Sequence, residues 1–271
     1  MTTQVSCERR GSGSPIVLVH GLGSRWQCFE PILDRLAAEH EVIAVDLPGF
    51  GRTPPIAGVE PGARGYARWL TGWLDRIGIE RPHVVGSSMG GGVALELGRA
   101  GIACAVTAFA PIGCYGRPGL WWVQGLLTAL RAAGGATGPL VSAALDHPAG
   151  KAVLLSALFG RPGRVPADSA RADVAALVAA ASFVAARDSF GGYRLALGDD
   201  PGALRRIPVT VAWGTRDAVL TYPTQSRRAR AVLPFARHVA LRHCGHLPFN
   251  DDPAACAALV LQDQVRRRDL R

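Results

Sequence analysis

Lysine is almost absent from this chain of 271 residues, since Lys151 is the only one among 30 basic residues. Acidic residues are also scarce, 21 in all, which leaves a formal net charge of +9. Such a balance can indicate a nucleic-acid or anionic-membrane partner. However, the arginines are scattered, and no aromatic residues interleave with the denser groups. We therefore expect a solvated basic surface and predict neither a nucleic-acid nor a membrane partner.

Long apolar runs and cysteine motifs are missing as well. The longest apolar stretch, residues 174–186, is rich in alanine and too short to span a bilayer. The first residues carry neither the positive charge nor the apolar segment of a secretory signal. The six cysteines are dispersed, with no Cys-x-x-Cys pair. Together these features predict a cytoplasmic protein with reduced, mostly buried thiols.

The segment His243–His246 reads His-Cys-Gly-His and is the one place that suggests a metal. A structural metal site needs about four ligands, and no second cluster of ligand-type residues accompanies this one. We predict no metal and no cofactor.

Apolar residues make up 48% of the chain, enough for the core of one large domain. They form short continuous runs that alternate with helix-like patterns. Continuous runs are typical of parallel strands buried on both faces, and the alternation predicts an α/β fold with a mostly parallel, doubly wound sheet. The expected strands are a short edge strand at 4–10 and buried strands at 16–19, 42–45, 83–87, 106–110, 207–213 and 237–241.

Residues 112–200 interrupt this alternation, because no strand pattern occurs there. Helix-like runs occupy 120–132, 149–158, 168–181 and the region around 183–190. We predict a core made of residues 1–111 and 201–271, with a helical cap, or lid, inserted at 112–200. Because the flanking strands end at the same sheet edge, the cap should lie over the site. The alternative is a long helical connection that only packs.

The central motif is Gly86–Gly90, which reads Gly-Ser-Ser-Met-Gly between a strand and a helix. Ser88 would lie at the sharp turn and project its hydroxyl above the sheet edge. Glycine is needed on both sides because a Cβ would collide across the turn. The Met89 amide would point into the same space and could stabilise an oxyanion. The alternative is a glycine-rich loop with a spare serine.

A nucleophilic serine needs a base, and the base needs an orienting carboxylate. In such a sheet these groups are expected later in the chain, in the order serine, acid, histidine. Asp217 follows the strand that ends near Trp213, and His246 follows the next strand. Both therefore fall at the edge that carries Ser88. Alone, Asp217 could be a turn carboxylate and His246 an ordinary loop histidine.

Three further residues compete for these roles. His20 and His243 are rival bases; we expect His20 to hold loops through hydrogen bonds and His243 to be a strand-edge residue. Asp46 is the rival acid, and we expect it to fix the turn that follows it. The loop His20–Gly23 should supply the second oxyanion donor, the amide of Leu22.

These motifs together resemble the α/β-hydrolase superfamily over nearly the whole chain. Within it, the resemblance points to a branch of serine-nucleophile esterases and C–C hydrolases. Epoxide hydrolases and haloalkane dehalogenases use an aspartate nucleophile, so Ser88 argues against both. Many C–C hydrolases have Asn before the nucleophile, and many esterases have His. This chain has Ser87 there, so the resemblance does not decide between these two kinds of enzyme. The matching segments are 20–23, 46–51, 86–91, 213–217 and 245–246.

The resemblance implies a serine hydrolase with a nucleophile elbow, an oxyanion hole and a Ser88-Asp217-His246 triad. We expect it to cleave a carboxylic ester or related acyl substrate through an acyl-enzyme. The alternatives are a C–C bond hydrolase, thioesterase or cyclase, and a non-catalytic member of the fold that binds a small ligand. Trp122 and Phe183, from the aromatic and apolar parts of the cap, are predicted to line a pocket for an apolar acyl or aryl group.

Overall fold

The computed structural model of the protein describes residues 4–136 and 138–269. Within them, one sheet has the strand order β1-β3-β2-β4-β5-β6-β7. Only β1 is antiparallel to its neighbour, and every other pair is parallel. The strands are β1 (Cys7–Arg10), β2 (Pro15–Val19), β3 (Glu41–Val45), β4 (His83–Ser87), β5 (Ala105–Phe109), β6 (Val209–Gly214) and β7 (Arg237–Leu241).

The sequence of each strand explains how deeply it is buried in the sheet. The central strands β4, β5 and β6 are buried at every position, as their mostly small or apolar sequences predict. In contrast, β1 alternates between exposed and half-buried positions, which suits an edge strand. The predicted mostly parallel α/β sheet is confirmed.

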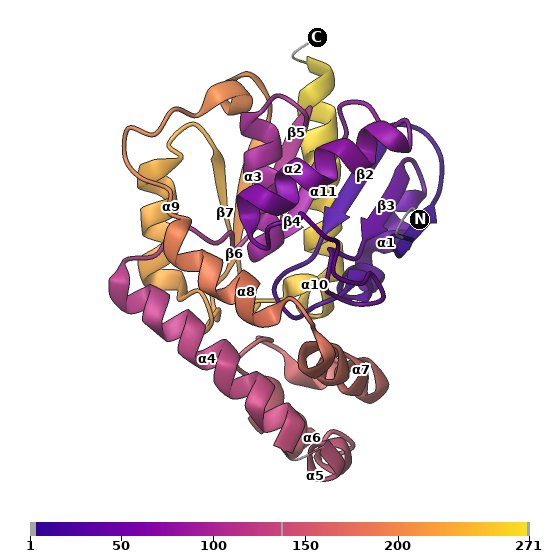
Figure 1. The fold of residues 1–271 in the computed structure, drawn as a ribbon, viewed down its shortest axis with the longest axis vertical. Helices are drawn as coiled ribbons and strands as arrows, with labels where there is room; N and C mark the ends of the chain where they lie inside the picture. Colours follow the sequence, from indigo (N-terminus) through magenta and orange to yellow (C-terminus); the bar gives the residue numbers. More distant parts are fainter. Residues whose placement is uncertain (1–3, 137, 270–271) are drawn as a thin grey trace.

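Helices cover both faces of the sheet (Figure 1). One face carries α2 (Ala63–Arg76) and α3 (Met89–Arg99), which pack on each other, and α3 also packs on β4 and β5. The other face carries α1 (Glu30–Ala37) and α11 (Pro253–Asp269), which also contact each other. Apolar residues of each layer form a separate buried cluster on either side of the sheet. The shorter helix α9 (Arg227–Val232) precedes β7 in the chain, and α10 (Pro248–Asp251) follows it and contacts α1 and α11.

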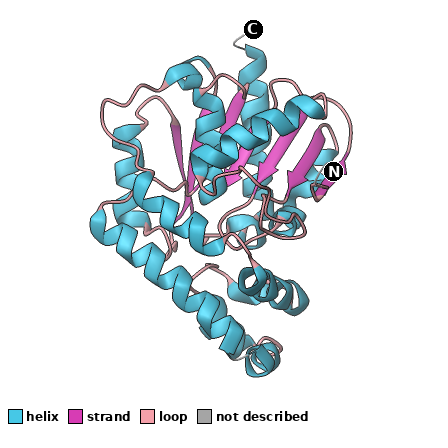
Figure 2. Cartoon of the chain, in the orientation of Figure 1, coloured by secondary structure: helices cyan, strands magenta, loops and turns pink. Residues whose placement is uncertain are grey.

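The helical insertion, residues 112–200, lies between β5 and β6 and beyond the carboxyl ends of the strands (Figures 1 and 2). Its described residues are helix and loop only. Four of its helices correspond to the predicted runs, and the short α5 begins with a glycine-proline pair that predicted only a break. The helices are α4 (Arg117–Ala136), α5 (Gly138–Ala144), α6 (Pro148–Leu155), α7 (Ala167–Ala179) and α8 (Phe183–Asp188).

The chain order reverses at β2, because β3 lies on one side of it and β4 on the other. The loops that follow β2 and β4 therefore meet at one switch point, where parallel α/β sheets form their crevice. A Cβ at Gly21 after β2 would lie 3.0 Å from the Ser88 Cβ after β4. The topology thus brings two of the predicted site segments into contact.

In the described part of the chain, no single helix is long and apolar enough to cross a membrane. The bent pair Ala167–Ala179 and Phe183–Gly192 reaches that length and composition only when both arms, 84° apart, are taken together.

Candidate active site

Ser88 occupies a sharp strand–helix turn between β4 and α3. Its backbone has φ 56° and ψ −114°, a conformation that residues with a side chain rarely adopt. Hydrogen bonds hold it there: the Ser88 amide donates to the Phe109 carbonyl at 2.9 Å, and the Ser88 carbonyl accepts from the Ile112 amide at 3.1 Å. Strand β5 therefore holds the amide of Ser88, and the segment after β5 holds its carbonyl.

The flanking glycines are required by contact distances. A Cβ at Gly86 would lie 2.0 Å from the Gly90 carbonyl oxygen, and a Cβ at Gly90 would lie 2.0 Å from the Val19 carbonyl oxygen. Both contacts are with backbone, which cannot move aside. The turn therefore tolerates only glycine at these two positions, as the motif predicts.

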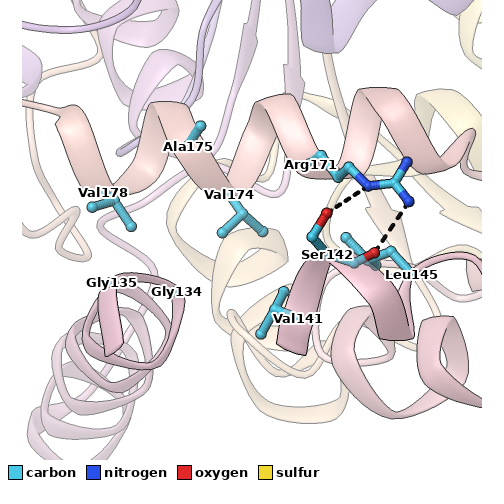
Figure 3. A pocket seen from close by; sticks show the side chains of 9 residues that line it. All are labelled: Gly134, Gly135, Val141, Ser142, Leu145, Arg171, Val174, Ala175 and Val178. Carbon is cyan, nitrogen blue, oxygen red and sulfur yellow. Dashed lines mark hydrogen bonds between the residues drawn. The ribbon is translucent and has the colours of Figure 1, made fainter. Parts of the chain in front are cut away.

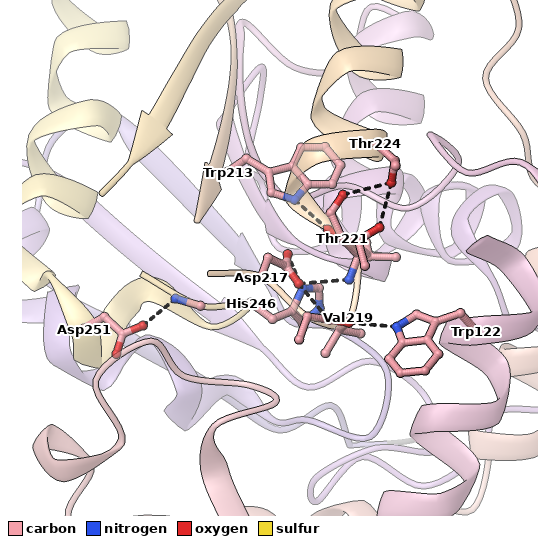
Figure 4. A network of polar contacts seen from close by, with 11 residues as sticks. Trp122, Trp213, Asp217, Val219, Thr221, Thr224, His246 and Asp251 are labelled. Atoms are coloured by element: carbon pink, nitrogen blue, oxygen red, sulfur yellow. Dashed lines mark hydrogen bonds and ion pairs between the residues drawn. The ribbon is translucent and has the colours of Figure 1, made fainter. Parts of the chain in front are cut away.

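His246 and Asp217 are joined by a short hydrogen bond. The His246 Nδ1 lies 2.8 Å from the Asp217 Oδ2, and both residues are about 95% buried. The other carboxylate oxygen of Asp217 accepts hydrogen bonds from the amides of Val219 and Leu220, each at 2.9 Å (Figure 4). With Asp217 fixed in this way and Nδ1 engaged, Nε2 is the imidazole nitrogen left for chemistry.

Ser88 and His246 line one cavity of about 90 Å³ between the sheet edge and the helical insertion. The loop after β2 forms one wall through Gly21, Leu22 and Gly23. The remaining wall is mostly apolar and comes from the insertion and the turn after His246. Its side chains are Leu127, Leu130, Leu155, Leu158, Phe159, Val174, Leu177 and Leu247.

Two backbone amides, one in the cavity lining and one next to the lining residue Ser88, have no hydrogen-bond acceptor among the described residues. The Leu22 amide belongs to the lining loop, and the Met89 amide is the first of helix α3, directly after Ser88. A first-turn amide has no partner within its own helix. These are the two amides that the sequence predicts as oxyanion donors.

His20 fixes the loop that carries the Leu22 amide. Its Nδ1 lies 2.7 Å from the Gly21 carbonyl oxygen, and its Nε2 lies 3.0 Å from the Leu47 amide, which donates to it. Accepting at Nε2 requires the proton on Nδ1, so the ring is a neutral bridge between two loops. Burial lowers the pKa of His20 from its ordinary value of 6.5, which also favours the neutral form. The structural role expected for His20 agrees with these bonds.

The other two rivals lie away from the cavity. Asp46 accepts hydrogen bonds from the amides of Trp26 at 2.7 Å and Arg52 at 2.9 Å, so its carboxylate fixes the following turn. His243 is exposed in the turn after β7, with φ 62°. No group of three or more His, Cys, Asp or Glu side chains within the described residues could hold a metal ion.

The two aromatic residues predicted for the pocket do not line it. Trp122 is 51% exposed on α4, and its Nε1 donates to the Ala218 carbonyl at 2.8 Å, beside Asp217 (Figure 4). Phe183 is buried in the main core, where the Arg131 guanidinium lies 4.7 Å from its ring centre. That part of the prediction is wrong because apolar residues of the insertion also serve as anchors and core.

Helix α7 forms a wall of the cavity that the sequence motifs did not indicate. Ala170, Asp173, Val174 and Leu177 line it, and their spacing of three, four and seven residues places them on one helical face. That spacing within the predicted helix 168–181 was the available signal. Asp173 is the only carboxylate of this lining.

Asp173 attaches α7 to the loop after β2. Its Oδ1 accepts hydrogen bonds from the Arg25 Nη2 at 3.2 Å and Nε at 3.3 Å. Burial nevertheless raises the pKa of Asp173 from its ordinary value of 3.8. The pair therefore connects the insertion to the core at the rim of the cavity.

Asp251 is a second residue that sequence reasoning missed. It is fully buried, and its carboxylate accepts hydrogen bonds from the amides of Gly160 at 2.8 Å, Arg161 at 2.7 Å and Gly245 at 2.7 Å. Two of these donors belong to the insertion, and the third precedes His246 (Figure 4). One carboxylate thus holds the histidine turn and the insertion together.

A known family matches most of the chain. Residues 16–259 match the model of the alpha/beta hydrolase family, and the chain belongs to that family. The predicted superfamily resemblance is therefore confirmed.

Individual relatives span different parts of the chain. An uncharacterized protein of Mycobacterium tuberculosis is 28% identical over 280 residues, which cover 92% of this chain and 75% of that protein. A 2-hydroxy-6-oxo-2,4-heptadienoate hydrolase of Pseudomonas putida is 36% identical over 88 residues, 31% of this chain and 32% of that one. A thermophilic esterase from Thermogutta terrifontis has a similar structure, with a TM-score of 0.69, 21% identity and coverage of 97% and 93%. At that identity, the structural likeness shows the fold.

Proposed function

We propose that this protein is a serine hydrolase that cleaves a carboxylic ester or related acyl substrate through an acyl-enzyme. The observation that carries the proposal is the arrangement at the cavity. Asp217 holds the Nδ1 side of His246, while His246 and the strained Ser88 line the same enclosed space. A histidine oriented in this way can act as a base toward a serine hydroxyl.

The first half of the reaction acylates Ser88. Its Oγ attacks the substrate carbonyl carbon while the His246 Nε2 accepts the hydroxyl proton. The carbonyl oxygen becomes an oxyanion, and the two unpaired amides of Leu22 and Met89 are the donors that would stabilise it. The carbon–oxygen bond to the alcohol then breaks, and His246 returns the proton to the leaving oxygen.

The second half frees the enzyme. His246 takes a proton from water, whose oxygen attacks the acyl carbon, and Ser88 leaves with that proton restored. Asp217 stabilises the imidazolium in both halves without becoming protonated itself. The apolar lining favours a substrate with an apolar acyl or aryl part and limits the access of water.

A fluorophosphonate probe, which labels activated serines, tests this proposal. We expect rapid labelling of the wild type and none of Ser88→Ala. Asp217→Asn should lower kcat toward a p-nitrophenyl ester by a factor on the order of 10⁴, because the imidazole loses its correct tautomer. Asp46→Asn is the matched control, since its carboxylate fixes the turn that follows it and does not line the cavity. Labelling of Ser88→Ala as fast as the wild type, or a greater loss in Asp46→Asn, would contradict the assignment.

A C–C bond hydrolase is the second candidate, because the Pseudomonas putida relative is named for such a reaction. Both candidates need an activated serine, so probe labelling does not separate them. Parallel assays with p-nitrophenyl esters and a vinylogous diketone do. Preferential turnover of the diketone would favour carbon–carbon cleavage, whereas an unlabelled, inactive protein would favour a non-catalytic binding role.

A further inference from the structure

A second hollow lies next to the catalytic cavity, on the neighbouring face of α7. It is an open groove of about 410 Å³ between α7, the end of α4 and α5 (Figure 3). Val174 belongs to the lining of both spaces. The two hollows therefore lie side by side along α7, and Val174 forms the boundary between them.

The geometry of α7 explains why one side chain can border both spaces. Successive helical residues are rotated by about 100°. Ala170, Asp173 and Leu177 therefore fall on the face toward the catalytic cavity, while Ala175 and Val178 fall on the adjacent face toward the groove. Val174 lies at the boundary, and Figure 3 shows its side chain extending from α7 into the groove.

The groove offers apolar contacts and no unpaired charge. Among the described residues of its lining, Arg171 is the one with a charged side chain. Its guanidinium donates to the carboxylates of Asp146 and Asp168, and its Nε donates to the Ser142 Oγ at 2.9 Å. With that charge neutralised, the groove suits a neutral hydrocarbon better than an anion.

One buried apolar cluster also contributes to the walls of both hollows. Leu145, which lines the groove, belongs to the same buried cluster as Leu155, Phe159 and Ala170, which line the catalytic cavity. A chain that crosses α7 at Val174 would therefore have side chains of this cluster on both sides of the crossing.

We infer that the groove is a subsite for the far end of a long acyl chain whose ester carbonyl lies at Ser88. The substrate class is thus a medium- to long-chain acyl ester, with the chain crossing α7 at Val174. This inference rests on the proposed acyl-hydrolase function and extends it. It differs from a short-acyl specificity, for which the cavity of about 90 Å³ alone would serve.

Two glycines of α4 allow a matched test. A Cβ at Gly135 would enter the groove, with Val178 as its nearest neighbour at an ordinary 3.8 Å. A Cβ at Gly125 would meet nothing within 4 Å and lies outside both hollows. Gly135→Leu should therefore fill the groove, while Gly125→Leu makes the same chemical change elsewhere on the helix. Ala175→Phe blocks the groove from α7 and serves if Gly135→Leu does not fold.

The measured quantity is the ratio of kcat/KM for p-nitrophenyl palmitate to that for p-nitrophenyl acetate. Gly135→Leu should lower this ratio at least about tenfold, the loss expected when two or more methylenes are no longer buried. Val174→Ala should raise it, and Gly125→Leu should leave it at the wild-type value. An unchanged ratio in folded Gly135→Leu and Ala175→Phe, or a wild type active on acetate but not on palmitate, would overturn the inference.

A binding measurement separates failure of the groove from failure of the proposed function. Ser88→Ala is titrated with parinaric acid, a fluorescent long-chain fatty acid, with and without Gly135→Leu. Weaker binding in the double variant supports the groove even if the wild type hydrolyses no ester. Equal binding in both, beside normal acetate hydrolysis by the wild type, would overturn the groove and leave the proposed function standing.

Discussion

Ser88 holds a backbone conformation that few residues other than glycine adopt, and its cost can be measured. The strain at φ 56° and ψ −114° should amount to about 1–3 kcal/mol. Glycine relieves it but increases the entropy of the unfolded chain, at a cost of about 0.4–1 kcal/mol. Ser88→Gly should therefore be more stable than Ser88→Ala by roughly 0.5–2 kcal/mol. Denaturant unfolding of the two inactive variants gives this difference directly.

Ser87 provides the control for that comparison. It is also buried, but it lies in β4, outside the positive-φ region. There glycine brings no relief of strain, so Ser87→Gly should be less stable than Ser87→Ala. If both positions rank glycine and alanine in the same order, the turn at Ser88 stores no strain.

Single residues differ in how far sequence predicts them. Ser88, Asp217 and His246 each follow a recognisable apolar strand, so the parallel topology alone places them at one edge. Trp122 and Phe183 were misplaced because their environment depends on how α4 and α8 are rotated against the core. That rotation results from packing across many residues, which a local pattern does not contain.

At the scale of elements, Asp251 connects the helical insertion to the turn that carries His246. Asparagine would offer one acceptor oxygen where three amides, those of Gly160, Arg161 and Gly245, now share two. A buried amide left without a partner costs about 1–3 kcal/mol. Asp251→Asn should therefore lower the melting temperature. It should also slow fluorophosphonate labelling of Ser88, because the histidine turn loses its anchor.

Asp252→Asn is the matched control. Within residues 4–136 and 138–269, the Asp252 carboxylate accepts only from the Ala255 amide, at 3.1 Å, in the first turn of α11. Asparagine caps a helix as well as aspartate does, so stability and labelling should remain near the wild type. A purely structural role for Asp251 would lower its melting temperature but leave the labelling rate of the folded protein unchanged.

Elements were predictable where local sequence determines them. The buried strands are continuous apolar runs, and the helices around them have clear amphipathic spacing. Asp251 escaped notice because its position before Pro253 already suits a helix start. Its partners Gly160 and Arg161 lie about ninety residues away in sequence. Helix α5 escaped because glycine and proline at its start also indicate a break.

At the scale of the whole molecule, the buried apolar side chains form three clusters of unequal size, so different parts of the fold are stabilised to different degrees. Two large clusters cover the faces of the sheet, whereas a small third one, built around Leu145, Leu155, Phe159, Val165 and Ala170, supports the outer insertion. Segments with few buried contacts open with lower free energies than the global unfolding. The insertion and the sheet should therefore behave as separate units in hydrogen exchange.

Exchange measured by mass spectrometry under native conditions should show this division. We expect backbone amides of α6 and α7 to exchange faster than those of the central strands β4 and β5. A phosphonate bound to Ser88 should then slow exchange in both helices, because Leu155 of α6 and Ala170 and Val174 of α7 line the cavity that it fills. Ser88→Ala mixed with the same reagent is the control. Equal protection of these helices and strands before labelling would show that the insertion does not open separately. If the phosphonate does not slow exchange in α6 and α7, the insertion does not enclose the substrate.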